Sequence, residues 1–237
     1  MKYASATYVE ETRIGFVFLR THTWQHHVLR VAINDLKRLA GEPAPQGGTL
    51  LDVGCGQGRS FRYLRDVFAP TRMLGLDADP HSIELSREET AREGIDVELF
   101  TSDCARIDLP DASVDTVFCH QTFHHLVEQE RALDEFWRVL KPGGLLLFAE
   151  STKAYIDSWV IRWFFRHPMH VQKTADEYVA MLRARGFVFT DAQVSLPYLW
   201  WSRAKDFGLL ERWGIKAAPP VGKREETLVN VAARKPG

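Results

Sequence analysis

The stretch Leu50-Leu51-Asp52-Val53-Gly54-Cys55-Gly56-Gln57-Gly58 joins an apolar run to a turn that contains three glycines. The run 49–53 is rich in Leu and Val, so we predict a short buried strand. A helical pattern begins directly after the turn, with Arg59-Ser60-Phe61. Strand, glycine turn and helix in this order form the unit that holds a nucleotide in doubly wound α/β folds. Glycine in such a turn lets the backbone adopt φ > 0 and lets a ligand approach the main chain.

The spacing of the glycines distinguishes this turn from the dinucleotide fingerprint. It is G-x-G-x-G rather than G-x-G-x-x-G, because position 59 is Arg, and an acid stands two residues before the first Gly. An acid followed by G-x-G-x-G resembles the first motif of class I S-adenosylmethionine (SAM)-dependent methyltransferases. The resemblance implies that the acid and the turn belong to a binding site for SAM and its product S-adenosyl-L-homocysteine (SAH), formed by Asp52, Gly54, Cys55, Gly56 and Gly58.

The composition describes a globular protein without a strong overall charge. The 237 residues are enough for one sizeable core and a small cap, and a net charge of −1 offers no basic field to nucleic acid. Three cysteines, an odd and small number, argue against a disulfide framework and for a reducing compartment. No apolar run reaches the roughly 18 residues of a membrane span, and the N-terminus lacks the apolar segment of a signal peptide. We therefore expect a cytoplasmic protein that is not an integral membrane protein and binds no nucleic acid.

From residue 49 onward, strand and helix patterns alternate. After the first strand, short apolar runs predict strands at 73–76, 97–100, 114–118 and 145–148. Asp79-Pro80 predicts a helix start, since Asp is a favoured N-cap and Pro suits the first helical position. Such alternation predicts a doubly wound, Rossmann-like α/β fold, with a mostly parallel sheet of seven strands and helices on both faces.

The residues that follow the parallel strands should meet at one edge of the sheet, where ligands bind in such folds. Besides the glycine turn, the polar residues there are Asp77 after the second strand, Asp103 after the third, and His120-Gln121 after the fourth. A carboxylate just past the second strand can accept hydrogen bonds from both hydroxyls of a ribose. Asp103 is placed to accept a hydrogen bond from an adenine amino group.

The family resemblance extends over residues 49–150 and implies roles for these positions. Lys141-Pro142-Gly143-Gly144 is typical of the methyltransferase-11-like branch, which acts on small molecules. By that resemblance, Asp77 binds the ribose, Asp103 contacts the adenine, and the backbone near His120 holds the methionine amine. The neighbouring residues counted with them as cofactor-binding are Ala78, Cys104 and Gln121.

Residues 1–48 precede this core and contain an amphipathic helix. Its apolar positions recur at helical spacing, at Trp24, Val28, Val31, Leu36 and Leu39, and a Gly-Glu-Pro-Ala-Pro linker at 41–45 stops the pattern. One interpretation is a helix that packs on the core with its histidines in solvent. The other is a wall of the active site, because the segment is richer in aromatic and imidazole groups than packing needs, namely Phe16, Phe18, His22, His26 and His27.

The C-terminal part, 151–237, departs from the shared core. Apolar residues at i, i+3, i+4, i+7 and i+8 predict a helix with one apolar face, formed by Ile156, Trp159, Val160, Trp163 and Phe164. Thr174-Ala175-Asp176-Glu177 is a capping box that opens a helix ending at Gly186. The segments 187–196 and 227–233 predict the last two strands, which the family resemblance makes an antiparallel pair.

About thirty residues separate these two strands, which is long for a loop in a compact domain and typical of a functional segment. We expect 154–172 and 198–226, together with the N-terminal segment, to form a cap over the methyl-acceptor pocket. The pocket residues predicted on this basis are His22, His26, Trp159, Trp163, Trp200 and Trp201. An aromatic helix face beside basic residues would also suit a homodimer contact or a membrane surface.

Methyl transfer from a sulfonium needs alignment of the acceptor atom and exclusion of water, and it needs a base only where the acceptor must lose a proton. The candidates for such a base are His124 and His125, on the loop after the fourth strand. The histidines of the predicted cap, His22, His26, His167 and His170, are alternatives, and a single dedicated base is not required. The cysteines form no C-x-x-C pair, so we expect small buried residues there and no metal site.

Three functions remain. The first is a SAM-dependent methyltransferase that moves a methyl group to O, N or C of a small apolar or aromatic metabolite, because the cap is rich in Trp and Phe. The second is a SAM-binding protein without transferase activity. The third is an NAD(P)-dependent oxidoreductase on a related fold, which is disfavoured because Arg59 stands where the third glycine of G-x-G-x-x-G would be.

Overall fold

A computed structural model of the chain describes residues 9, 12–199, 202 and 209–237. Among these residues, seven strands form one sheet in the order β3-β2-β1-β4-β5-β7-β6. The strands are β1 (Thr49–Val53), β2 (Arg72–Asp77), β3 (Glu98–Thr101), β4 (Val114–His120), β5 (Leu140–Ser151), β6 (Val194–Ser195) and β7 (Leu228–Arg234). β7 runs antiparallel to both of its neighbours, and the pairings among β1 to β5 are parallel. The predicted fold class is confirmed.

Single α-helices connect β1 to β2, β2 to β3 and β4 to β5, while β3 leads to β4 without a helix. The helices are α1 (Arg13–Phe18), α2 (His22–Trp24), α3 (Arg30–Ala40), α4 (Phe61–Phe68), α5 (Pro80–Glu93), α6 (Gln129–Val139), α7 (Lys153–Ile156), α8 (Trp159–Phe164), α9 (Ala175–Arg185) and α10 (Leu209–Arg212). A π-helical turn, Gln25–Leu29, joins α2 to α3, and 3-10 turns occupy Phe123–His125, Met169–Val171 and Asp191–Gln193. Asp79 caps α5 through the N–H of His81 and Ser82, as predicted from the sequence.

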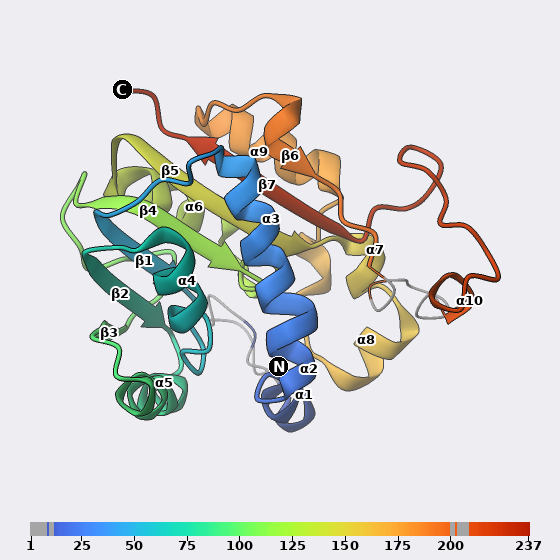
Figure 1. The fold of residues 1–237 in the computed structure, drawn as a ribbon, viewed down its shortest axis with the longest axis horizontal. Helices are drawn as coiled ribbons and strands as arrows, with labels where there is room; N and C mark the ends of the chain where they lie inside the picture. Colours follow the sequence, from blue (N-terminus) through green and yellow to red (C-terminus); the bar gives the residue numbers. More distant parts are fainter. Residues whose placement is uncertain (1–8, 10–11, 200–201, 203–208) are drawn as a thin grey trace.

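Two helical layers sandwich the sheet (Figure 1). On one face, α3 and α4 pack through Leu36 and Leu64 against Leu50, Phe118 and Leu147, and α5 joins this layer beside Phe61. On the other face, α6 and α9 bury residues that include Phe136 and Tyr178. Apolar strands buried on both faces are what a parallel sheet covered by helices requires.

The order of the strands reverses between β1 and β4. β1 pairs with β2 on one side and with β4 on the other, so the chain crosses the sheet at this point. Val53 at the end of β1 lies beside Cys119 near the end of β4. Open α/β sheets bind ligands in the crevice outside the carboxyl ends of such strands. The topology therefore places the glycine turn and the residues after β4 at one crevice.

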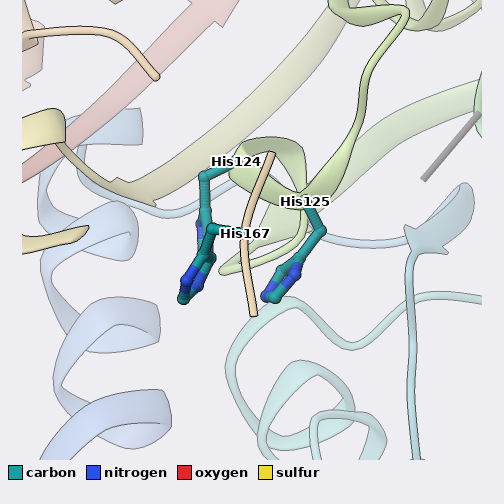
Figure 2. Close-up of side chains that lie close together, drawn as sticks. All are labelled: His124, His125 and His167. Carbon is teal, nitrogen blue, oxygen red and sulfur yellow. The ribbon is translucent and has the colours of Figure 1, made fainter. Parts of the chain in front are cut away.

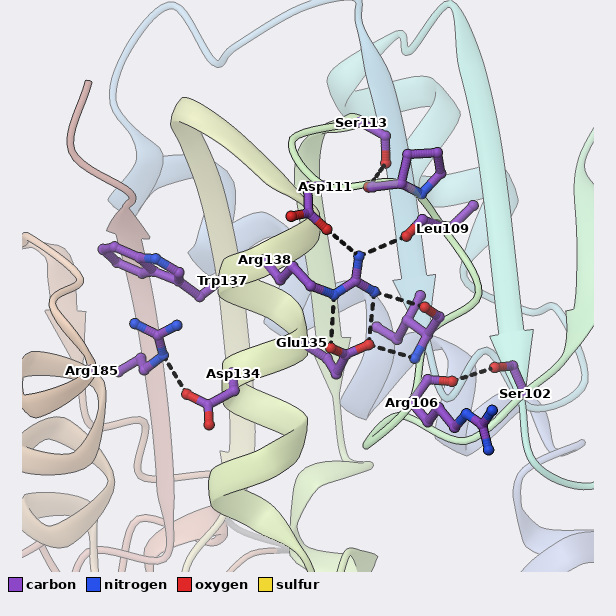
Figure 3. A network of polar contacts seen from close by, with 12 residues as sticks. Ser102, Arg106, Leu109, Asp111, Ser113, Asp134, Glu135, Trp137, Arg138 and Arg185 are labelled. Carbon is purple, nitrogen blue, oxygen red and sulfur yellow. Dashed lines mark hydrogen bonds and ion pairs between the residues drawn. The ribbon is translucent and has the colours of Figure 1, made fainter.

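An arginine on α6 fastens the loop that follows the third strand (Figure 3). The guanidinium of Arg138 donates to the carbonyl oxygens of Ile107 and Leu109 at 2.7 Å each and to Asp111 at 2.7 Å. It also pairs with Glu135 at 2.8 Å, and that carboxylate accepts the N–H of Ile107 at 2.7 Å. These charged hydrogen bonds hold 107–111 against α6, so the segment between β3 and β4 has a fixed path.

The sixth strand is much shorter than predicted. The segment 187–196 contributes only Val194–Ser195 to β6 and an isolated bridge between Val188 and Arg234. The interruption is local, because Thr190 and Gln193 form a reciprocal capping box that opens a 3-10 turn. A strand cannot continue through a turn in which the side chains take the backbone hydrogen bonds.

The helix with one apolar face is also different from the prediction. It is divided into α7 and α8, because Ser158 stops the first helix and caps the second by accepting the N–H of Ile161. The break interrupts the helical periodicity on which the predicted apolar face depended. As a result, Ile156 and Ile161 are buried, whereas Trp159 and Trp163 are 61% and 80% exposed.

The described part of the insertion at 198–226 extends away from the sheet, and α10 lies at its tip (Figure 1). Its apolar side chains Leu209, Leu210, Trp213 and Ile215 are exposed. Arg224 secures the base of the insertion by donating to the carbonyl oxygens of Leu196 and Pro219 and by stacking on Tyr198. No helix in the described part of the chain is both long enough and apolar enough to span a bilayer.

Candidate cofactor and acceptor site

A cavity of about 700 Å³ lies at the carboxyl ends of the central strands. The core contributes the glycine turn and the residues after β2, β3 and β4, which are mostly polar. Segments outside the core contribute a largely apolar wall that includes Phe16, Phe18, Trp24, Ile161 and Phe165. The cavity therefore has two chemically different walls, and its volume is in the range of ordinary ligand sites.

The glycine turn needs its glycines for two different reasons. Gly54 has φ +71°, and a Cβ on it would lie 2.2 Å from the side chain of Thr122, whose hydroxyl donates to the Gly54 carbonyl at 3.2 Å. Gly56 has φ +52° and lines the cavity, and a Cβ on it would meet no protein atom within 4 Å. Gly54 thus lets the turn pack against the loop after β4, while Gly56 leaves its backbone open to a ligand.

Asp77, at the end of β2, presents its carboxylate to the cavity. One oxygen accepts the N–H of Gly56 at 2.9 Å, and the other accepts the N–H of Asp79 at 2.9 Å. Burial raises the pKa of this carboxyl, and the two backbone N–H groups counteract part of that rise. Each oxygen keeps a second lone pair, so the carboxylate can still accept hydrogen bonds from a ligand.

Asp52 lies behind the turn and does not line the cavity. It is buried, and it accepts a hydrogen bond from the hydroxyl of Ser60 at the start of α4. Burial raises its pKa to about 7, although the Ser60 hydrogen bond acts in the opposite direction. Cys55 and Gly58 are also absent from the cavity wall, and a Cβ on Gly58 would lie 2.5 Å from Ser86 Oγ. These three predicted cofactor residues shape the turn from behind.

Most of the predicted residues after β3 and β4 line the cavity, and one does not. Asp103 and Cys104 line it, and one Asp103 oxygen accepts the N–H of Ala105 at 2.8 Å. Gln121 lines it with φ +52°, held by the Ser151 hydroxyl, which donates to its side-chain oxygen at 2.6 Å. Ala78 is also on the wall. His120 is buried behind the wall.

The imidazole of His120 packs between the rings of Trp24 and Phe118, with centroids 5.6 and 5.9 Å away. Its Nε2 has no hydrogen-bond partner within the part of the chain that the structure describes. Burial lowers its pKa to about 4, so the ring is neutral near pH 7. A buried neutral ring in this position supports the strand end and leaves the backbone beside it for a ligand.

Three imidazoles gather on the wall next to the segments outside the core (Figure 2). His124 and His125 belong to the 3-10 turn after β4, and His167 follows α8. Their ring centroids are 4.4 Å apart for His124 and His125, 5.1 Å for His124 and His167, and 4.7 Å for His125 and His167. Burial lowers the pKa of His125 well below its ordinary value and that of His167 to about 3, and the neighbouring His124 adds to both effects.

A buried carboxylate at the end of β5 orients the first of these rings. Glu150 is fully buried, and one of its oxygens lies 2.6 Å from His124 Nδ1. Its other oxygen accepts the N–H of Thr122 and of Phe123, both at 2.9 Å. Burial opposes ionisation of Glu150, but these hydrogen bonds outweigh it and lower its pKa. The sequence prediction missed Glu150, although an acid at the end of an apolar strand is the same signal that identified Asp77.

The N-terminal segment connects the two sides of the cavity. The side-chain amide of Gln57 in the glycine turn donates to the Phe16 carbonyl at 3.0 Å, and the Phe16 ring stacks on His81 at 5.5 Å. On the other side, Thr12 donates to the carbonyl of Phe164 at 2.6 Å. The segment therefore lies across the opening between the glycine turn and α8.

Several predicted pocket residues lie elsewhere. Trp159 and Trp163 are not on the cavity wall, because the break at Ser158 directs them to solvent. His22 and His26 are also absent from the wall and stack on each other at 3.8 Å. Trp200 and Trp201 lie outside the described residues. On the wall instead are Phe16 and Phe18, which belong to the second interpretation of the N-terminal segment, and Phe165, which the sequence analysis did not single out.

Comparisons with known proteins match this architecture. Residues 51–148 match the methyltransferase-11 family, described as a methyltransferase domain. The chain is 34% identical over 146 residues to a protein of Mycolicibacterium smegmatis named "Probable S-adenosylmethionine-dependent methyltransferase", a match that covers 61% of this chain and 54% of that protein. It is 30% identical over 120 residues to the demethylmenaquinone methyltransferase of Deinococcus radiodurans, covering 50% of each. The chain thus spans about half the length of these relatives.

The whole chain has a structural counterpart as well. The crystal structure of a SAM-dependent methyltransferase from Aquifex aeolicus superposes with a TM-score of 0.64 at 22% identity and covers 93% of this chain and 97% of that one. At this identity the likeness concerns the fold. Residues 51–148 therefore form a methyltransferase domain of the methyltransferase-11 family, and the chain around it has the fold of a SAM-dependent methyltransferase.

Proposed function

We propose that this chain transfers a methyl group from SAM to an O, N or C atom of a small apolar or aromatic metabolite. The observation that carries the proposal is the single cavity with two unlike walls. Its polar wall suits the cofactor, and its aromatic wall suits an apolar acceptor. Alignment of two reactants in one water-poor space is the main contribution that a protein makes to such a reaction.

The residues of the polar wall fit the cofactor. The space beside Gly56 can accommodate a ligand in contact with the backbone, and the Asp77 carboxylate on the same wall would accept hydrogen bonds from the ribose hydroxyls. Asp103 would contact the adenine, and the backbone beside Gln121 would hold the methionine part. When bound, SAM supplies a methyl group on a positively charged sulfur.

The aromatic wall would position the acceptor. Phe18 and Phe165 meet edge to face at 6.1 Å although they belong to distant segments, so together they form one aromatic surface on which a flat or aliphatic group can pack. The imidazoles of His124 and His125 provide the polar end of this wall, where the heteroatom of the acceptor would lie. A base at this position contributes only when the acceptor carries a proton that must leave.

Two other functions can be separated from this one. A SAM-binding protein without transferase activity would use the same polar wall. An oxidoreductase that binds NAD(P) is disfavoured further by the structure, because Arg59 is engaged with Glu89 at 2.6 Å where the fingerprint requires a glycine for close packing.

The test combines binding and product analysis. Calorimetry with SAH and with NAD separates the methyltransferase family from the oxidoreductase, and we expect binding of SAH alone. Incubation with SAM and panels of phenols, fatty acids and amines, followed by mass spectrometry, should reveal an acceptor that has gained one methyl group. Binding of SAH with no methylated product in any panel would favour the protein without transferase activity.

The exposed aromatic side of α8 supports a further part of the proposal, a homodimer. Trp159, Trp163 and Phe164 are solvent-exposed on one short helix, and a large exposed apolar patch is typical of an interaction site. Sedimentation of the wild type and of Trp163→Ala tests it, with a shift toward monomer expected in the variant. A dimer retained in Trp163→Ala, or a wild-type monomer that binds anionic vesicles through α8, would contradict it.

We propose the cytoplasm as the compartment of this protein, consistent with three buried cysteines that form no disulfide.

A further inference from the structure

We propose that His124, His125 and His167 form a binding site for a divalent transition-metal ion, and that Zn²⁺ is the ion this ligand set suits. One nitrogen from each imidazole lies within 4.8 Å of the others. Zn–N distances of about 2.0–2.1 Å put two ligand nitrogens roughly 3.4 Å apart at a tetrahedral angle. The three rings stack or tilt against one another, so their side chains must rotate to bring the nitrogens to the spacing that a single ion requires.

The carboxylate behind His124 fixes the ring as it does in many metal sites. Glu150 lies 2.6 Å from Nδ1 and is itself held by two backbone N–H groups. With Nδ1 engaged, Nε2 is the nitrogen of His124 that can bind an ion. A carboxylate that accepts from the far nitrogen of a ligating histidine sets its tautomer and increases its basicity. Its negative charge also offsets part of the charge of the ion.

A glutamine joins the two chain segments that bring the histidines together. The buried side-chain amide of Gln172 donates to the His124 carbonyl at 2.7 Å and to the Pro168 carbonyl at 3.1 Å. Pro168 follows His167 directly, so this amide holds the backbone on both sides of the cluster. The carbonyl of His125 is held as well, since it accepts the N–H of Val9 at 3.1 Å. Ligands fixed at the backbone lose little entropy when an ion binds.

Three histidines leave a zinc ion with at least one open coordination position, which is the arrangement of catalytic rather than structural sites. All three residues line the cavity on the side of the aromatic wall. The open position would therefore face the acceptor, and an acceptor oxygen or nitrogen is the ligand it would take. This assignment of the fourth ligand rests on the proposed function, whereas the metal site itself does not.

Direct binding measurements test the site. We would strip the 237-residue chain of metal with a chelator and titrate it with Zn²⁺ by calorimetry and with Co²⁺ by visible absorption, which reports tetrahedral coordination. We expect one ion per chain. His167→Ala should weaken binding by more than the roughly 10–100-fold that loss of a residue behind a ligand costs, and Glu150→Gln should weaken it within that range. His167→Phe keeps a ring in the cluster and should lose the ion as His167→Ala does.

Two matched variants exclude other histidines. His170→Ala removes an exposed imidazole three residues beyond His167, and His26→Ala breaks the stacked pair with His22. Both should bind Zn²⁺ as the wild type does. The proposal is overturned if the stripped wild type binds no Zn²⁺ at micromolar concentration, if His167→Ala and His167→Phe bind it normally, or if His26→Ala is the variant that loses it. SAH affinity is measured on the same samples. Normal SAH binding without Zn²⁺ binding overturns the metal site alone, whereas absent SAH binding contradicts the proposed function.

Discussion

Asp77 accepts the backbone N–H of Gly56 at 2.9 Å, so the acid after β2 and the glycine after β1 are one structural unit. Both line the cavity, and the hydrogen bond holds the open face of Gly56 beside the Asp77 carboxylate. A ligand that touches the glycine backbone is therefore within reach of the acid. The predictions about the cofactor follow from this pairing.

Replacement of Gly56 by Val should abolish SAH binding and leave the protein folded. A side chain at this position meets no protein atom but occupies the cavity. The left-handed backbone, φ +52°, adds roughly 1–3 kcal/mol of strain. Gly94→Val is a matched control, since Gly94 has φ +62°, an equally open Cβ direction and a place at the end of α5. Calorimetry and thermal unfolding of both variants check this, and normal SAH binding by folded Gly56→Val would contradict it.

Asp52 should make the stability of the protein depend on pH. Its pKa is about 7 in the folded state, against about 3.9 in an unfolded chain. Between these values the folded state holds more protons, so the free energy of unfolding falls as the pH rises, by on the order of 4 kcal/mol over the whole window. Asp52→Asn lacks this titration and should gain stability relative to the wild type as the pH rises.

Urea unfolding of the wild type and Asp52→Asn at pH 5 and pH 7.5 measures this difference. His120 acts in the opposite direction, because its pKa lies near 4 and its burial as a neutral ring favours folding as the pH rises. The pH dependence of the free energy of unfolding of the wild type alone therefore does not isolate Asp52. The difference in that free energy between the wild type and Asp52→Asn does. An equal difference at both pH values would refute the assignment.

Arg138 should matter for stability and not for the cofactor. It makes charged hydrogen bonds to two carbonyl groups and two carboxylates, and losing them should cost roughly 2–4 kcal/mol in Arg138→Ala. Arg131→Ala removes one exposed pair with Glu128 and should cost less than about 1 kcal/mol. Denaturant titration compares the two. A loss of SAH affinity in folded Arg138→Ala would show that 107–111 supports the cofactor wall.

The aromatic wall predicts which residues govern the acceptor. Phe165→Ala should lower kcat/KM for the acceptor by about 10-fold or more with SAH affinity unchanged, because it removes a ring from the acceptor side. Trp163→Ala should leave kcat/KM within about twofold, since its ring is 80% exposed. Steady-state kinetics with the identified acceptor decide this. If Trp163→Ala lowers kcat/KM and Phe165→Ala does not, this prediction is wrong, and the exposed aromatic side of α8 contacts the acceptor, as the sequence predicts.

The parts of the fold that follow from local sequence were predictable. β1, the glycine turn, the Asp79 cap of α5 and the acid after β2 each depend on neighbouring residues and on the rule that ligands bind at strand ends. Asp52 was different, because the sequence places it beside the glycines but cannot show that it lies behind them.

The features that the sequence could not provide depend on contacts between distant segments. His167 joins His124 only because the chain returns to the loop after β4 and Gln172 fastens it there. The exposure of Trp163 depends on one cap, Ser158, which divides a helix that periodicity alone makes continuous. Glu150 was within reach of sequence reasoning, since a lone acid at the end of a buried strand calls for a partner.

The most direct test of the account is SAH calorimetry on the wild type and on Asp77→Ala. We expect the wild type to bind SAH in the micromolar range and the variant to bind about 30–150-fold more weakly, since the loss of two charge-assisted acceptors corresponds to roughly 2–3 kcal/mol. Asp66→Ala, an exposed acid on α4, is the control and should bind as the wild type does. Equal SAH affinity in the wild type and folded Asp77→Ala, or no SAH binding by the wild type, would contradict the cofactor site described above.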